Sequence, residues 1–181
     1  MEKEFEVKVL GMDLDALEKK LIKLGGKLIA EEEQTNILID SSQRPIKSYL
    51  DAYLRIRKTK DLLTKEEKTV ITLKKNLGKD GIRGNMEIST EVKDEKVLLE
   101  ILKDLGFDRV EVGYKRRKSY EFMDARLDFD QWDENTYPYP YMEIEVRDIK
   151  HLNKITSSLE IPQENISTKS IVQLRKELKL V

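Results

Sequence analysis

The chain has no cysteine, one histidine, four prolines and eight glycines in 181 residues. Without cysteine there is no disulfide, no thiol nucleophile and no thiolate metal site. No apolar run approaches the roughly 18 residues that a membrane span needs, and the acidic N-terminus lacks the apolar segment of a signal peptide. These absences predict a cytoplasmic protein that does not enter a membrane.

An excess of charge of one sign is also missing. Charged residues make up 38% of the chain, but 34 Lys and Arg nearly balance 35 Asp and Glu. A general nucleic-acid binder is usually basic overall, so the balance argues against that class and leaves room for a local basic pocket. The length predicts a single domain over residues 1–181, with about 70% of the unfolded surface buried on folding.

What the chain does have is strict alternation of charged and apolar residues. Because side chains of a strand point alternately to its two faces, residues 2–10 predict a strand with one charged and one apolar face. The charged face carries Glu2, Glu4, Glu6 and Lys8. Later segments repeat the pattern with basic faces at Arg55, Arg57, Lys74, Lys115 and Arg117. Acidic faces follow at Asp128, Asp130, Glu143 and Glu145.

The order of elements predicts an antiparallel α+β fold that can close into a barrel. Helices are expected after the N-cap residues Asp13 and Asp94, over Asp148–Leu159 and over Lys169–Leu180. Residues 58–69 and 75–84 are expected to form connections, the second with three glycines. Two separate strands are expected over Val110–Arg117 and Ser119–Met123.

The charged faces have two possible environments. If they face water, the protein is an interaction module with solvated sheets. If the sheet closes, the buried charges must be paired or must bind ions. A polyphosphate then suits the basic residues Arg55, Arg57, Lys74, Arg83, Lys115 and Arg117. Mg²⁺ or Mn²⁺ suits the carboxylates of Glu4, Glu6, Asp128, Glu143 and Glu145.

Seven motifs, in order along residues 2–147, resemble those of the CYTH-domain proteins, the triphosphate tunnel metalloenzymes. Glu4-Phe5-Glu6-Val7-Lys8 fits the ExExK signature of that family. The later matches are Tyr53–Arg57, Ile71–Lys74, Arg83–Glu91, Lys115-Arg116-Arg117, Asp128 and Glu143-Ile144-Glu145. The chain departs from the pattern at Ser89, where a further acid is common, and it lacks the histidine motif of some class IV adenylate cyclases.

The resemblance implies an eight-stranded antiparallel β-barrel with helices packed outside and a charged interior that binds a triphosphate with Mg²⁺ or Mn²⁺. It implies hydrolysis of tripolyphosphate, thiamine triphosphate or a nucleoside triphosphate. The implied metal ligands are Glu4, Glu6, Asp128, Glu143 and Glu145. The implied phosphate-binding residues are Lys8, Arg55, Arg57, Lys74, Arg83, Lys115 and Arg117. The implied catalytic residues are Glu4, Glu6, Lys8 and Asp128.

Three alternatives remain open at this point. A class IV-type adenylate cyclase would convert ATP to cyclic AMP and pyrophosphate, a non-catalytic protein would only bind triphosphates, and an interaction module would bind neither metal nor phosphate. The sequence also leaves open the organic group of the substrate, the number of metals, and whether the chain is a monomer or a homodimer. We expect Trp132 to pack and Lys169 to lie on a helix surface.

Overall fold

The computed structural model describes residues 2–77 and 83–180, with side chains described for residues 5–77 and 84–180. This part of the chain forms nine strands, four α-helices and two short 3-10 helices, Ile46–Ser48 and Gln163–Asn165. The strands are β1 (Glu2–Val9), β2 (Lys27–Asp40), β3 (Ala52–Asp61), β4 (Glu67–Asn76), β5 (Arg83–Glu91), β6 (Arg109–Phe122), β7 (Ala125–Trp132), β8 (Tyr141–Val146) and β9 (Ile166–Ser167). The helices are α1 (Leu14–Lys23), α2 (Glu95–Asp104), α3 (Ile149–Leu159) and α4 (Ile171–Glu177).

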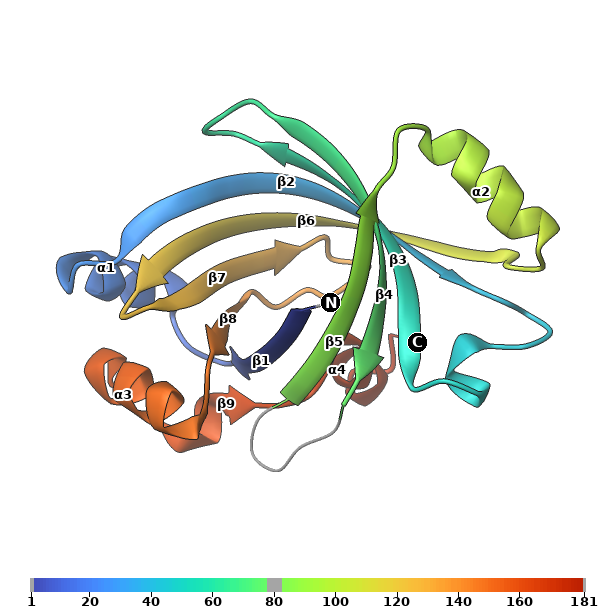
Figure 1. The fold of residues 1–181 in the computed structure, drawn as a ribbon. Coiled ribbons are helices and arrows are strands. Elements are labelled where there is room, and N and C mark those ends of the chain that lie inside the picture. The colour runs from blue at the N-terminus through green and yellow to red at the C-terminus, as the bar shows by residue number, and fades with distance from the viewer. Residues whose placement is uncertain (1, 78–82, 181) are drawn as a thin grey trace.

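Eight of the strands form a closed barrel. The strand order is β5-β4-β3-β2-β6-β7-β8-β1-β9, and an additional pairing of β1 with β5 closes the ring (Figure 1). Every pairing is antiparallel, and β9 adds to β1 outside the ring. The predicted α+β fold, an eight-stranded antiparallel barrel with helices outside, is therefore confirmed.

Each helix begins at a side chain that caps its first turn. The carboxylates of Asp13, Asp94 and Asp148 accept hydrogen bonds from backbone amides of their helices at 3.0, 3.1 and 2.8 Å. Ser170 and Gln173 form a reciprocal capping box at the start of α4. These caps satisfy amides that have no partner within the helix, which is why the predicted starts at Asp13 and Asp94 are correct.

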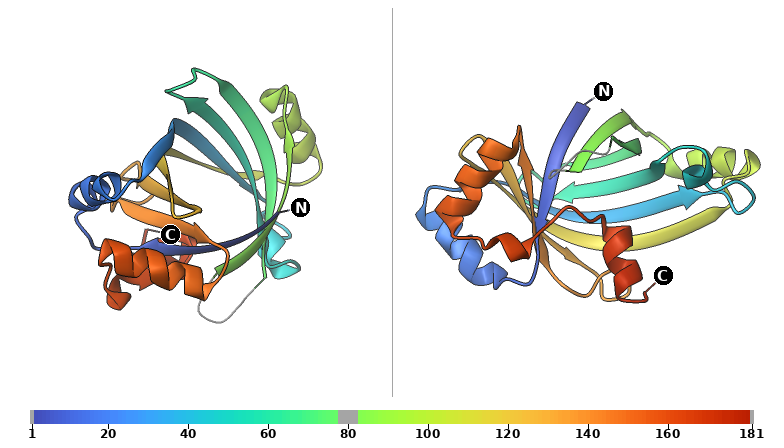
Figure 2. Two further views of the ribbon diagram at one scale, coloured as in Figure 1. Left: turned by 60° about the vertical axis from the view of Figure 1, so that its left-hand side comes forward. Right: turned by 90° about the horizontal axis from the view of Figure 1, so that it is seen from below.

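The apolar core lies between the barrel and its helices. On one side α1 and α3 pack against β1, β6, β7 and β8, and on the other side α2 packs against β2, β3 and β4 (Figures 1 and 2). The larger cluster includes Leu21 and Ile155 from the helices and Val7, Leu127 and Ile144 from the strands. Because the apolar faces of the strands point outward to these helices, the alternate, charged faces point into the barrel.

The C-terminal helix α4 packs at one end of the barrel. Leu174 joins a cluster with Tyr137 and Tyr141, and Arg175 forms an ion pair with Glu111. Tyr141 lies two residues before Glu143 at the start of β8, and Glu111 lies two residues before Gly113 near the start of β6. Both therefore occupy inward-facing positions. The helix therefore lies across the barrel end where β8 begins.

Several strands are longer than predicted. The connection expected over residues 58–69 is mostly a hairpin, because β3 continues to Asp61 and β4 starts at Glu67. This hairpin projects at the top of Figure 1, away from the helices, so it needs no apolar face. The two strands expected around Lys118 are one strand, β6. A connection was expected over residues 75–84, but β4 continues to Asn76 and β5 begins at Arg83. Gly78 and Gly81 lie outside the described residues. In the described part of the chain, every helix is too short or too polar to span a membrane.

Candidate active site in the barrel interior

The strand register brings opposite charges face to face inside the barrel. Arg117 on β6 pairs with Asp130 on β7, and Lys8 on β1 pairs with Glu143 on β8. Directly opposed residues of an antiparallel pair have neighbouring side chains on the same face. The interior is therefore built from cross-strand pairs of opposite charge.

Arg117 is the centre of this network. Its Nε donates to Asp130 Oδ1 at 2.6 Å, its Nη2 donates to Glu143 Oε2 at 2.8 Å, and its Nη1 lies 2.5 Å from Asp128 Oδ2. Asp128 is also bonded by Arg126, whose Nε lies 2.9 Å from Oδ1. Three carboxylates on two strands hold one guanidinium, which fixes its plane and raises its already high pKa against the opposing effect of burial.

Lys115 lies two residues from Arg117 on the same inner face. Its Nζ donates to Asp130 at 2.7 Å and lies 5.2 Å from the ring centroid of Trp132. Burial and the charge of Arg117 lower the pKa of Lys115 to about 7, although Asp130 opposes the change. Burial and the neighbouring arginines therefore disfavour the charged form of Lys115 more than Asp130 and Glu143 favour it.

Arg57 on β3 adds to this positive region. Burial, Arg55 and Arg117 lower the pKa of Arg57 to about 10, and Arg57 in turn contributes to the lowered pKa of Lys115. The Nε of Arg57 donates to Asn36 Oδ1 at 2.8 Å, and the Nε of Arg55 has no hydrogen-bond partner among the described residues. Arg57 of β3 thus lies close enough to Lys115 and Arg117 for their charges to repel.

A second group of ion pairs extends along β1 and β4. Lys8 lies 2.9 Å from Glu143 and 3.7 Å from Glu6. Lys74 lies 3.6 Å from Glu6 and 2.7 Å from Glu87. Glu6 is thus shared by two lysines, and the carboxylates of Glu6 and Glu143 meet at one ammonium group.

Two buried carboxylates, Asp130 and Glu143, are held in the ionised form. Burial alone would raise the pKa of Glu143, but Lys8 and Arg117 hold it well below its usual value. Burial likewise opposes ionisation of Asp130, and Arg117 and Lys115 lower its pKa. Asp130 and Glu143 are therefore ionised at neutral pH, each beside the cations that lower its pKa.

The structure brings most of the predicted site residues together. The connected group contains Glu6, Lys8, Lys74, Lys115, Arg117, Asp128 and Glu143, and Arg55 and Arg57 face it from β3. Glu145 lies on β8 opposite Arg126 and in alternation with inward-facing Glu143. The register places Glu4 opposite Asn85 and Glu6 opposite Arg83, while the side chains of Glu4 and Arg83 lie outside the described residues.

Sequence reasoning left several interior residues out of the site. Asp130 lies two residues after Asp128, and Glu87 lies two residues before Ser89, so both could be recognised as acidic residues on inward-facing positions. Both form short ion pairs. The neutral amides of Gln34, Asn36 and Asn85 are also almost fully buried. Their only signal in the sequence is their spacing of two from other inward-facing residues. Trp132 packs, as predicted, and donates from Nε1 to the Tyr141 hydroxyl at 2.9 Å. Lys169 lies before α4, half-exposed and paired with Glu177.

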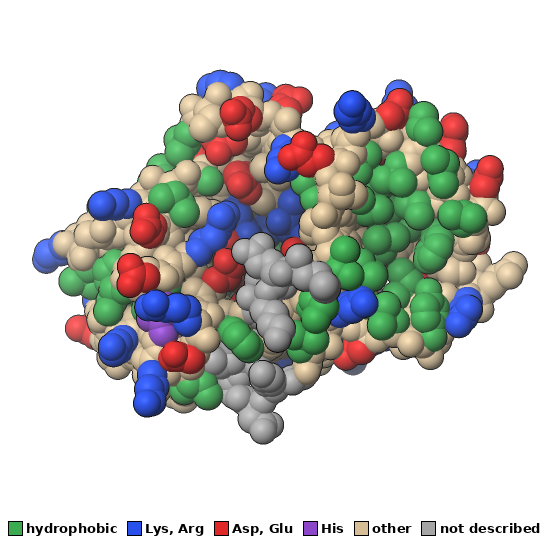
Figure 3. Space-filling model, viewed as in Figure 1, with side chains coloured by type: hydrophobic (Ala, Val, Ile, Leu, Met, Phe, Trp, Pro, Cys, Tyr) green, Lys and Arg blue, Asp and Glu red, His purple; other side chains and the backbone are tan. Residues whose placement is uncertain are grey.

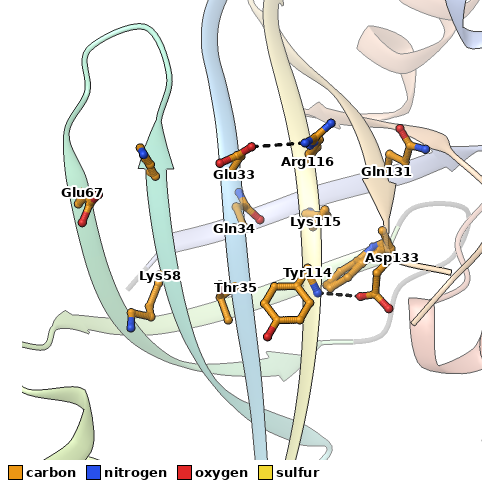
Figure 4. A pocket seen from close by; sticks show the side chains of 12 residues that line it. Glu33, Gln34, Thr35, Lys58, Glu67, Tyr114, Lys115, Arg116, Gln131 and Asp133 are labelled. Carbon is orange, nitrogen blue, oxygen red and sulfur yellow. Dashed lines mark hydrogen bonds and ion pairs between the residues drawn. The ribbon is translucent and has the colours of Figure 1, made fainter. Parts of the chain in front are cut away.

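The surface adds two features. Lys and Arg side chains gather in the hollow between the two lobes of the face in Figure 3, with acidic side chains beside them. A cavity of about 580 Å³ lies against β2, β3, β6 and β7 (Figure 4). Most of its lining residues, such as Thr35, Tyr114 and Arg116, are direct chain neighbours of inward-facing residues and therefore point outward. This cavity lies on the outer side of the sheet.

Among the described side chains, no three metal-binding residues cluster closely enough to form a metal site by themselves.

Comparison with known proteins gives a consistent family. The model of the CYTH domain matches residues 2–173. A Methanocaldococcus jannaschii protein, named provisionally as an adenylate cyclase, is 28% identical, and the match covers 95% of this chain and 98% of that protein. The structure of the PH1012 protein from Pyrococcus horikoshii is 26% identical, covers 94% of this chain and 98% of that one, and superposes with a TM-score of 0.73.

A plant protein shares the fold at greater distance. An adenylyl cyclase candidate from Hippeastrum, described as having a dominant triphosphatase activity, is 15% identical. The match covers 100% of this chain and 98% of that chain, with a TM-score of 0.66. At this identity the similarity shows a common fold.

Proposed function

Because this chain belongs to the CYTH domain family, we propose that it is a divalent-metal-dependent phosphohydrolase that cleaves a triphosphate inside the barrel. The observation that carries the proposal is the convergence of Arg57, Lys115 and Arg117. Lys115 and Arg117 share the carboxylate of Asp130 at 2.7 and 2.6 Å, and burial and repulsion among the three basic groups lower the pKa of Arg57 and Lys115 to about 10 and about 7. A polyphosphate is the ligand that relieves such repulsion.

The phosphate groups lie among the basic side chains of five strands in this proposal. Arginine forks from β3 and β6 bind phosphoryl oxygens from two sides, and lysines add point charges around them. The full proposed set is Lys8, Arg55, Arg57, Lys74, Arg83, Lys115 and Arg117. Asp128 and Asp130 hold Arg117 in place through contacts of 2.5 and 2.6 Å, which keeps the guanidinium oriented before substrate arrives.

The carboxylates at Lys8 suit a hard divalent cation. The donor set consists only of carboxylate oxygens, which Mg²⁺ and Mn²⁺ prefer, and Glu6 and Glu143 already meet within 3.7 and 2.9 Å of the same ammonium. The proposed ligands are Glu4, Glu6, Glu143 and Glu145, and the two arginines around Asp128 leave it a positioning role. When bound, such a cation neutralises phosphate charge and activates water for attack on phosphorus.

A class IV-type adenylate cyclase is the second candidate. The observation in its favour is the name of the Methanocaldococcus jannaschii relative. The described activity of the Hippeastrum protein favours hydrolysis instead. The two reactions differ in their products: hydrolysis of ATP releases orthophosphate or pyrophosphate with a linear nucleotide, whereas cyclisation gives pyrophosphate and cyclic AMP.

The direct test is a panel of tripolyphosphate, thiamine triphosphate and ATP, each with Mg²⁺ or Mn²⁺, with every product identified. We expect phosphate release from at least one compound and none after chelation of the metal. Cyclic AMP as the main product from ATP would select the cyclase, and no turnover of any compound would leave a binding protein.

Glu143→Gln is the sharpest variant for this proposal, because the amide keeps the shape but loses the charge that a metal needs. Loss of partners outside the first coordination sphere costs 10- to 100-fold in other metal enzymes, so loss of a direct ligand is expected to lower turnover by about 100-fold or more. Glu33→Gln is the matched control, since Glu33 lies on the outer face of β2 and pairs with Arg116. Full activity of Glu143→Gln would show that the ligand assignment is wrong.

A further inference from the structure

Two asparagine side chains inside the barrel have hydrogen-bonding atoms without partners. Asn85 on β5 is fully buried, and neither its Nδ2 nor its Oδ1 has a partner among the described residues. Asn36 on β2 is 2% exposed, and its Nδ2 also has none. Buried amides in folded proteins are almost always hydrogen-bonded, so each of these groups requires an explanation.

Both amides face the charged interior. Asn85 lies two residues before Glu87, on the same face of β5, and the carboxylate of Glu87 contacts Lys74 at 2.7 Å. In the strand register Asn85 lies opposite Asn76 and Glu4. Asn36 is opposite Arg57 on one neighbouring strand and Gly113 on the other. The amides thus reach the interior from two different parts of the barrel wall, on β5 and on β2.

The orientation of Asn36 is fixed by Arg57. Because Arg57 Nε donates to Asn36 Oδ1 at 2.8 Å, the carbonyl end of the amide is occupied. The Nδ2 end, a donor only, is the end without a partner. A ligand at this position must supply an acceptor, and phosphoryl oxygens are acceptors that carry charge.

We propose that Asn36 and Asn85 are further substrate-binding residues, each donating from Nδ2 to a phosphoryl oxygen of the bound triphosphate. The proposal rests on the proposed function, because it takes the barrel interior as the phosphate site. Neutral donors suit this position, since they bind phosphate oxygen without adding to the repulsion among Arg57, Lys115 and Arg117. At Asn85, where neither amide atom has a partner among the described residues, leucine has the same branching of heavy atoms and would avoid the cost of burying the amide, so the free protein gains nothing from asparagine there.

The test compares ligand binding with stability in the same variants. Asn85→Leu and Asn36→Leu remove the donors, and Ser89→Ala is the control. Ser89 lies on the same face of β5, and its hydroxyl is bonded to Thr72 at 2.9 Å. Isothermal titration calorimetry with a hydrolysis-resistant imido analogue of tripolyphosphate and Mg²⁺ measures affinity, and calorimetry without ligand measures Tm.

We expect Asn85→Leu to weaken binding about tenfold or more, the usual consequence of losing a hydrogen bond to a charged group, and to raise Tm. Asn36→Leu should also weaken binding, but it removes the acceptor of Arg57 Nε as well, so Asn85→Leu is the decisive variant. Ser89→Ala should bind as the unmodified protein does. Weaker binding with a lower Tm would assign Asn85 a structural role and overturn the inference. Unchanged affinity would also overturn it and leave the proposed function standing, whereas no binding by the unmodified protein would refute both.

Discussion

Arg116 and Arg117 are consecutive residues of β6 with opposite environments. The side chain of Arg116 is 80% exposed and has one ion pair at 3.6 Å, whereas Arg117 is 8% exposed and contacts three carboxylates. Replacing Arg117 by Met removes one of the two cation partners of each of three buried carboxylates, so we expect a loss of about 3–5 kcal/mol in the free energy of unfolding. Arg116→Met should change it little, because exposed pairs contribute little. Urea unfolding at pH 7 measures both, and equal losses would show that the interior network does not govern stability.

Lys115 predicts a pH dependence of known sign. The unfolded chain keeps the proton of Lys115 up to its ordinary pKa of 10.5, whereas the folded protein loses it near the lowered pKa of about 7. Between these values the unfolded state binds more protons, so the free energy of unfolding rises with pH, by at most about 1.4 kcal/mol per unit. Lys115→Met lacks this contribution. The free energy of unfolding of the unmodified protein minus that of Lys115→Met should therefore increase from pH 7 to pH 9. A constant value of this difference would contradict the lowered pKa.

At the residue scale, the sequence predicted charged positions better than neutral ones. Strict alternation marked Lys8, Arg117 and Glu143, and all three lie in one network. Asn36 and Asn85 could not be recognised, because an amide is an ordinary residue of any polar strand face. Only closure of the barrel buries them, and closure depends on pairings between segments far apart in the chain.

At the scale of elements, Gly113 shows how closely β6 approaches the chain that follows β7. A Cβ on Gly113 would lie 2.6 Å from Thr136 Oγ1 and 3.1 Å from Trp132 Cζ3. We expect Gly113→Ala to cost about 1–3 kcal/mol through overpacking. In a double-mutant cycle, Thr136→Ala should recover part of this cost, because it removes the nearest atom.

Gly84→Ala is the control for that cycle. Gly84 is also a strand glycine, but an added Cβ would meet nothing nearer than Phe5 Cε1 at 3.4 Å. Its substitution should cost much less than that of Gly113 when both are measured by urea unfolding. Additive effects of Gly113→Ala and Thr136→Ala would show that the close approach does not constrain β6.

The elements that local signals define were predicted accurately. The bounds of β8, Tyr141–Val146, and the helix starts at Asp13 and Asp94 follow from alternation and capping, which act over a few residues. The hairpin of β3 and β4 was missed beyond Lys58, because it projects past the apolar core and so has no apolar face to read. Its strands are held by backbone pairing, as between Lys60 and Glu67, and such pairing leaves little trace in residue type.

At the scale of the whole molecule, the barrel reverses the usual arrangement, since its apolar faces point outward to helices and its charged faces inward. Burying so many charges is tolerable only because they pair: Lys8 with Glu143, Lys74 with Glu87 and Arg117 with Asp130. A triphosphate that binds the cations must displace carboxylates from them. In the proposed function a divalent metal would take up those released carboxylates, so each ligand would prepare the interior for the other.

This exchange predicts cooperative binding of metal and triphosphate. Thermal unfolding is measured for the protein alone, with Mg²⁺, with the imido analogue of tripolyphosphate, and with both. Saturation at about 100 times Kd adds about 2.7 kcal/mol, which corresponds to a rise of about 5–10 °C in Tm for a chain of this length. We expect the rise with both ligands to exceed the sum of the separate rises. The reason is that a metal bound by Glu6 and Glu143 frees the cations paired with them, and these cations can then bind the triphosphate. Additive rises would mean that the two ligands bind without exchanging partners.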